Sequence, residues 1–97
     1  MEAGDVREFI NNLSIQDEMV RYKGKLYYFY GIRYDSKREM YYTSIDEFGT
    51  DIYHFEKEFY RYESKSSVDC LEHLVSDTYW DGKDFYQVEN EMIWVDG

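Results

Sequence analysis

The stretch LYYFYGIRY, residues Leu26 to Tyr34, decides the fold, because it is the most apolar and most aromatic run of the chain. Aromatic and β-branched side chains favour a pleated strand, in which successive residues point to opposite faces. The alternation places Leu26, Tyr28, Tyr30, Ile32 and Tyr34 on one face and Tyr27, Phe29 and Arg33 on the other. We therefore expect a central β-strand that is covered on both sides.

The residues before this strand predict a helix and a hairpin. Asp5 followed three residues later by Glu8 has the spacing of a capping box, and apolar residues then recur at helical spacing. A short amphipathic helix is expected over about residues 6–13. The alternating segment 19–23 is typical of a strand, and Lys23-Gly24-Lys25 supplies a tight turn into the central strand.

Short polar segments divide the following residues into strands, which implies an antiparallel meander. The expected order is a loop at 35–39, a strand at 40–45, a turn at 46–50, and strands at 52–55 and 59–62. Glu56-Lys57-Glu58 interrupts the alternation. The pattern leaves three alternatives there: a bulge, a turn, or a break between two strands.

Two further capping boxes predict helices near the C-terminus. Ser66 with Asp69 begins a helix that carries a narrow apolar stripe and ends near Asp77. The remaining elements are a turn at 81–82, a short helix capped by Asp84 and Gln87, and a strand at 93–95.

These elements predict an α+β fold in a single small domain spanning residues 1–97. We expect a twisted antiparallel sheet of four or five strands, with the N-terminal helix and one or two C-terminal helices packed on it. The strand meander covers about residues 19–62, and an acidic helical region with the final strand covers about residues 66–95. A chain of 97 residues can bury an adequate core without disulfides or metals.

The formal charge of −10 is concentrated in the C-terminal third of the chain. Residues 1–34 hold five acids and five bases, residues 35–65 hold eight acids and five bases, and residues 66–97 hold eight acids and one base. A field of this sign repels phosphate backbones, so direct binding of DNA or RNA is disfavoured. Basic protein surfaces are the electrostatically preferred partners.

Three features bear on location. Cys70 is the only cysteine, which excludes an internal disulfide and agrees with a reducing cytosol. The acidic N-terminus lacks the apolar segment of a signal peptide, and no apolar run reaches the length that crosses a bilayer. We expect a cytoplasmic protein without membrane contact.

Cys70 and His73 stand three residues apart on the second expected helix, a spacing at which a thiolate and an imidazole can interact or share a metal. His54 is the only other histidine, and the spacing matches no common zinc pattern. Carboxylate pairs are numerous, but such spacings arise by chance in a chain with 21 acids. We assign no catalytic residue, metal site or cofactor.

A ladder of tyrosines can stack nucleic-acid bases or sugars where a positive groove lies beside it. Basic residues do concentrate near the first two hairpins, at Arg21, Lys23, Lys25, Arg33, Lys37 and Arg38. Core packing and solubilisation of the edge strands account for the same residues, and we favour that interpretation.

As function we expect a non-enzymatic, acidic protein-binding module. Its most concrete form is an inhibitor or adaptor of the anti-defence type, which occupies a basic surface of a nucleic-acid-handling protein by nucleic-acid mimicry. Small acidic inhibitors of host defence nucleases have a similar composition, which is an analogy of composition alone. Acids three residues apart on a helix stand about 5 to 6 Å apart, which is of the order of the spacing of backbone phosphates. The expected contact residues are Asp69, Glu72, Asp77, Asp81, Asp84, Glu89 and Glu91.

Several alternatives stay open. The acidic third could be only a solvated surface, or it could dock on a basic protein unrelated to nucleic acid. The chain could also be a small enzyme or ligand-binding domain with a pocket of tyrosines and carboxylates. A subunit that dimerises through an exposed tyrosine-rich face is the last alternative, so we expect a monomer or a homodimer.

Overall fold

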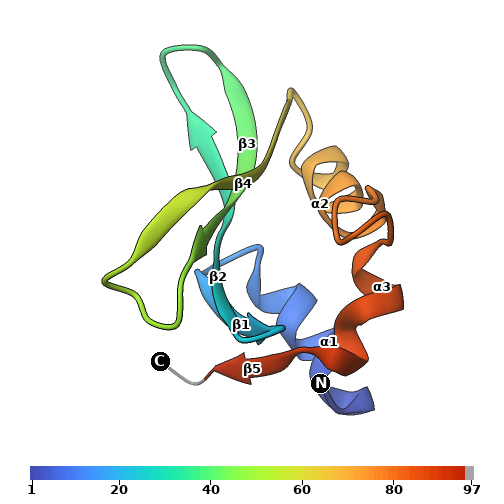
Figure 1. Ribbon diagram of the computed structural model, residues 1–97. Coiled ribbons are helices and arrows are strands. Elements are labelled where there is room, and N and C mark those ends of the chain that lie inside the picture. The colour runs from blue at the N-terminus through green and yellow to red at the C-terminus, as the bar shows by residue number, and fades with distance from the viewer. Residues whose placement is uncertain (96–97) are drawn as a thin grey trace.

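The computed structural model describes residues 1–95 and confirms the predicted α+β fold with its tyrosine-rich sheet (Figure 1). The five strands form one antiparallel sheet in the order β4-β3-β2-β1-β5. In chain order the elements are α1 (Ala3–Asn12), β1 (Glu18–Tyr22), β2 (Lys25–Asp35), β3 (Met40–Phe48), β4 (Phe55–Ser64), α2 (Ser67–Ser76), α3 (Phe85–Val88), the 3-10 turn η1 (Glu89–Glu91) and β5 (Ile93–Val95). None of the helices in this part of the chain is long and apolar enough to cross a membrane.

The helices all lie on one side of the sheet, to the right of the strands in Figure 1. Burial alternates along β1, where Val20 and Tyr22 are buried against the helices and Met19 and Arg21 point to the opposite side. No helix of residues 1–95 covers that opposite side, which we call the uncovered face. The expectation of cover on both sides is therefore wrong. Rings on the uncovered face tolerate water because tyrosine hydroxyls keep polar partners there.

Aromatic rings fill the core between the sheet and the helices. Trp80, which follows α2, is 1% exposed, and its ring centroid lies 5.0 Å from that of Tyr27 and 4.8 Å from that of Phe59. Phe9 of α1 meets Phe29 of β2 edge to face at 5.2 Å. Each such ring buries 150 to 250 Å², so its transfer from water contributes at most about 4 to 6 kcal/mol.

The alternation of β2 breaks at Gly31. The pairing of β2 with β3 shifts register just before Ile32, so Ile32 faces α2 and Arg33 lies on the uncovered face. Gly31 has a φ of +75°, and a Cβ at this position would stand 2.7 Å from the carbonyl oxygen of Leu13. The predicted faces of Ile32, Arg33 and Tyr34 are therefore wrong, because one extra residue in a strand inverts the side chains that follow it.

The β3–β4 hairpin differs most from the predicted pattern. β3 continues through Phe48, so the turn predicted at 46–50 and the strand predicted at 52–55 are displaced, and residues 49–54 connect the strands. Glu47 stays in the strand because it is buried and accepts hydrogen bonds from the Tyr27 hydroxyl (2.9 Å) and the Lys25 ammonium (3.4 Å).

The segment Glu56-Lys57-Glu58 lies inside β4. The pairing of β3 with β4 shifts register on both sides of Asp46 and Glu47, opposite this segment. Of the three alternatives, the bulge is the one that the structure contains.

The helix boundaries follow local capping in two cases of three. The Ser66 side chain accepts from the Asp69 amide at the start of α2, and Asp84 and Gln87 form a complete capping box at α3. The predicted start of α1 is wrong, because the helix begins at Ala3 and places Asp5 in its first turn. The Met1 ammonium donates to the carbonyl oxygens of Glu89 (2.7 Å) and Met92 (2.5 Å) and thereby anchors this earlier start.

We predict that Gly31→Ala lowers the free energy of unfolding by about 2 to 4 kcal/mol, through left-handed strain and collision with the Leu13 carbonyl. The matched control is Gly24→Ala. Gly24 has a φ of +81° but nothing within 4 Å of the added methyl group, so strain alone should cost about 1 kcal/mol. Urea unfolding measures both, and equal losses would show that the contact at Gly31 is unimportant.

Candidate functional site

The expected contact acids are distributed over several elements, and most of them have a partner within the protein. Glu72 and Glu91 are exposed, and neither makes a hydrogen bond or ion pair with the side chains of residues 1–95. The five members with partners are Asp69, Asp77, Asp81, Asp84 and Glu89. The contacts of these five weaken the case for a regular array of free carboxylates.

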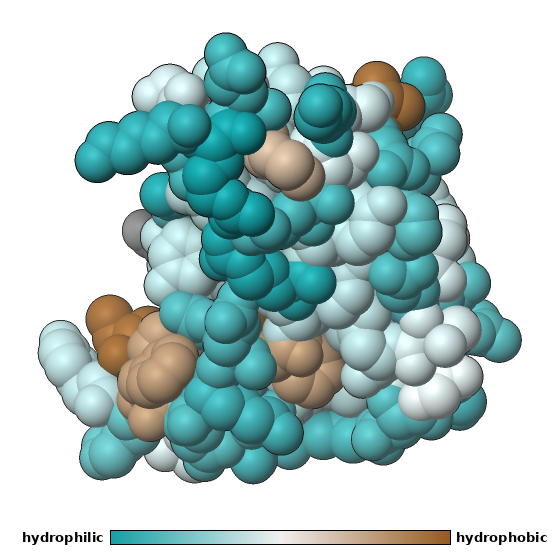
Figure 2. Space-filling view, turned by 90° about the horizontal axis from the view of Figure 1, so that it is seen from above, coloured by the Kyte–Doolittle hydropathy of each residue, from teal (hydrophilic) through white to brown (hydrophobic). Residues whose placement is uncertain are grey.

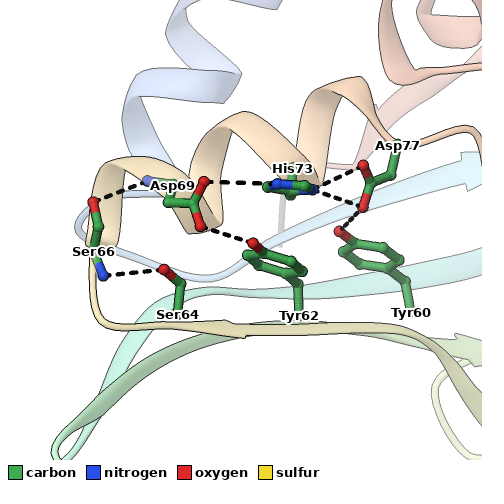
Figure 3. A network of polar contacts seen from close by, with 7 residues as sticks. All are labelled: Tyr60, Tyr62, Ser64, Ser66, Asp69, His73 and Asp77. Atoms are coloured by element: carbon green, nitrogen blue, oxygen red, sulfur yellow. Dashed lines mark hydrogen bonds and ion pairs between the residues drawn. The ribbon is translucent and has the colours of Figure 1, made fainter.

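Asp69 and Asp77 come together around His73 on the side of α2 that faces β4 (Figure 3). The His73 ring stacks on Tyr62, with centroids 4.0 Å apart and an interplanar angle of 14°. Its Nδ1 lies 3.0 Å from Asp77 and its Nε2 lies 3.6 Å from Asp69. The hydroxyls of Tyr60 and Tyr62 donate to Asp77 and Asp69 respectively, each over 2.7 Å.

The hydrogen bonds of this cluster keep the protons on the hydroxyls of Tyr60 and Tyr62. The hydrogen bond to Asp69, together with burial, raises the pKa of Tyr62 to about 12, and burial together with Asp77 raises the pKa of Tyr60 further. The hydroxyls of Tyr62 and Ser64 hold the pKa of Asp69 below its ordinary value. Both phenols therefore stay protonated at neutral pH and are poor bases or nucleophiles. The cluster joins α2 to β4.

Cys70 does not take part in this cluster. Its side chain is fully buried in the core side of α2, and burial raises the pKa of the thiol. A thiol in that state is unreactive, because the thiolate is the nucleophile and the metal ligand. Across residues 1–95, no group of three or more His, Cys, Asp or Glu residues is arranged to hold a metal ion.

A groove lies between α1, β1 and β5, and sequence reasoning missed it. It has a volume of about 630 Å³ and is lined by four carboxylates and the edge of the last strand. These carboxylates are Asp5, Glu8, Asp17 and Glu18. Only Asp17 among them pairs with a cation of the described residues, through Arg33 at 3.0 Å.

Glu18 forms the floor of this acidic groove. It is 8% exposed and accepts hydrogen bonds from Trp94 Nε1 (2.6 Å), Gln16 Nε2 (2.6 Å) and Asn12 Nδ2 (3.2 Å). Three neutral donors satisfy the carboxylate oxygens but leave the negative charge uncompensated. Charge at this depth is screened less than charge at the surface, so it adds strongly to the potential in the groove.

On the uncovered face, the tyrosine ladder is paired with both arginines and acids. The hydroxyl of Tyr30 donates to Asp46 over 2.7 Å, and the guanidinium of Arg33 lies 5.1 Å from the centre of the Tyr30 ring. The guanidinium of Arg61 lies 4.8 Å from the centre of the Tyr42 ring. The strands of this face contribute three arginines and four carboxylates: Arg21, Arg33, Arg61, Asp35, Asp46, Glu58 and Glu63.

A positive groove beside the tyrosines is not formed by the described residues. Four of the six basic residues expected near the first two hairpins are neutralised by acids within 4 Å, namely Lys23, Lys25, Arg33 and Arg38. The geometry thus gives the tyrosine ladder no electrostatic attraction for a phosphate backbone.

Comparison with protein-family models, with curated proteins and with solved structures gives no match to this chain. The site must therefore be interpreted from its own geometry.

We predict that Tyr62→Phe raises the pKa of Asp69 toward its ordinary value, because the hydroxyl that stabilises the carboxylate is lost. A lowered carboxyl pKa adds stability above pH ~4, and this contribution is lost as the pH falls through the folded-state pKa. The variant should therefore show a shallower loss of stability in acid. Carboxyl ¹³C NMR titration measures the pKa directly.

The control for this substitution is Tyr53→Phe, since Tyr53 is 86% exposed and its hydroxyl is in water. An unchanged pKa of Asp69 in Tyr62→Phe would show that the hydrogen bond does not stabilise the carboxylate.

Proposed function

We propose that the protein is a non-enzymatic binding module that docks on a basic surface of a partner protein. It docks through the side of the sheet that carries the helices and the acidic groove, which we call the acidic side. Its most concrete role is that of an inhibitor or adaptor of a nucleic-acid-handling protein, in which the acidic side occupies a surface that otherwise holds nucleic acid.

The observation that carries the proposal is the separation of charge between the two sides of the sheet. The strands of the uncovered face hold three arginines and four carboxylates, so most of the formal charge of −10 arises elsewhere in the chain. A field concentrated on one side steers a basic partner toward that side and speeds association.

The negative potential is strongest in the acidic groove, because a concave site lined by charges of one sign concentrates the field. Its low-dielectric walls include the ring of Trp94, and carboxylates line the opening. A lysine or arginine side chain from a partner could enter the groove, pair with Glu8 and Asp5, and stack on an aromatic ring. Glu72 and Glu91 remain the members of the predicted C-terminal set that are exposed and available to a partner.

We predict that Glu8→Lys weakens the complex with the partner about tenfold or more, because it places a cation at the mouth of the acidic groove. The partner is first recovered by affinity capture from a lysate of the native cells. We expect a basic, nucleic-acid-associated protein whose affinity falls steeply between about 50 and 200 mM salt and which duplex DNA displaces. Titration calorimetry or surface binding measures the affinity.

The matched control is Glu39→Lys, which makes the same change in net charge at an exposed position of the β2–β3 loop. Equal effects of the two variants would mean that only total charge matters. Binding that ignores salt, or that DNA does not displace, would contradict the proposed role.

A further inference from the structure

We infer that the uncovered face of the sheet is the interface of a symmetric homodimer, in which two copies pack face to face through their sheets. This inference does not rest on the proposed function. The helices and the uncovered face lie on opposite sides of the sheet, and the acidic groove reaches the uncovered face at its rim, through Asp17 and Val95.

One half of the uncovered face is apolar. Residues paired across neighbouring strands share a face, so Ile93 lies beside Arg21, and Val95 lies beside Met19. Leu26 also lies beside Arg21, but it is only 4% exposed. Phe48 and Phe55 continue this surface across β3 and β4, with ring centroids 5.7 Å apart. Ile93 is 64% exposed and Phe55 is 59% exposed, so this half of the face leaves large apolar side chains in water.

The connection between β3 and β4 extends the apolar surface. Ile52 and Tyr53 are exposed, and the Thr50 carbonyl accepts a hydrogen bond from Arg21, which holds the hairpin close to β1. The hairpin projects to the left in Figure 1, and Figure 2 shows hydrophobic side chains gathered at that edge of an otherwise mostly hydrophilic surface.

The other half of the uncovered face is polar and self-complementary in charge. A shallow hollow of about 320 Å³ is lined by the tyrosine rings and by ions of both signs, among them Arg33, Arg61, Asp46 and Glu58. A two-fold axis brings the same patch of both copies together, so each patch must complement itself. Three arginines and four carboxylates on this face allow each copy to place its cations opposite the anions of the other. Tyrosine and arginine are also the side chains enriched at interfaces.

Charge distribution selects a second copy as the occupant. Two molecules that each carry −10 repel one another in most orientations. Contact through the nearly neutral uncovered face turns the acidic sides away from each other and reduces this repulsion. A basic partner, in contrast, has little electrostatic preference for a face on which the charges of the strands nearly cancel.

The area of the uncovered face is also adequate for a stable dimer interface. Five strands spaced about 4.8 Å apart, with a mean length of roughly 25 Å, outline roughly 600 Å² before the relief of the side chains is added. A standard interface buries about 800 Å² per partner, and the projecting hairpin supplies further area. Pairing through the β4 edge is disfavoured, because the bulges and the charges of Glu56, Lys57 and Glu58 protect it.

Sedimentation equilibrium of the full chain tests the inference. We expect the mass to rise from 11.9 kDa to twice that value with increasing protein concentration. The variant Ile93→Lys should weaken dimerisation about tenfold or more, since it places two new cations near Arg21 and its symmetry mate. Phe55→Lys should act in the same way. Both side chains are exposed, so circular dichroism should show an intact fold.

Val68→Lys is the matched control, because Val68 is also 64% exposed but lies on α2, on the helical side. It makes the same change in net charge and should leave the dimer intact. A monomer at every concentration and salt would overturn the inference, and so would equal effects of Ile93→Lys and Val68→Lys. Glu8→Lys should leave dimerisation unchanged, so a failure of the dimer is distinguishable from a failure of partner binding.

Discussion

Trp80 packs at the centre of the helical face of the sheet, and the rest of the structure depends on that contact. Its ring touches aromatic side chains from β1, β2 and β4, at Tyr22, Tyr27, Phe29 and Phe59. Two backbone hydrogen bonds between Trp80 and Lys83 close a tight turn, and this turn positions the Trp80 ring against the sheet. One side chain thereby holds the segment between α2 and α3 against three strands. Because this cluster and Phe9 draw every helix to one side, the opposite side of the sheet has no helix over it and carries an apolar half beside a half of tyrosines, arginines and acids.

Local hydrogen bonds made the N-cap of α2, the capping box of α3 and the turn at Lys23-Gly24 predictable from sequence, since each is decided within four residues. Features set by distant partners were not predictable. Gly31 is needed because the Leu13 carbonyl approaches it from another element. Glu47 looks like a turn residue in the sequence, but Tyr27 on the neighbouring strand supplies the hydrogen bond that allows it to be buried. Neither contact can be inferred from the residues next to Gly31 or Glu47 in the sequence.

The acidic groove also could not be predicted from sequence, because it depends on which charges distant segments bring together. Residues 1–34 sum to zero charge, so a count along the chain gives no hint of an acidic groove among them. In the fold, two bases of that segment, Lys23 and Lys25, pair with acids from later segments. The acids near α1 lose these counter-charges and gather in the groove around Glu18. Conversely, Asp81 of the C-terminal third is neutralised by Lys23. Folding therefore moves part of the negative potential from the C-terminal third toward the N-terminal helix.

The separation of charge connects the two proposed surfaces without making either depend on the other. A dimer formed through the uncovered face holds two acidic sides pointing in opposite directions, each with its own groove. A partner with two basic sites at a matching distance would then engage both sides, and the second contact would form at a high effective concentration. The affinity of each side could be modest, as expected where much of the acidic charge is already paired within the chain. The packing of one face around Trp80 thus sets the conditions for association at both.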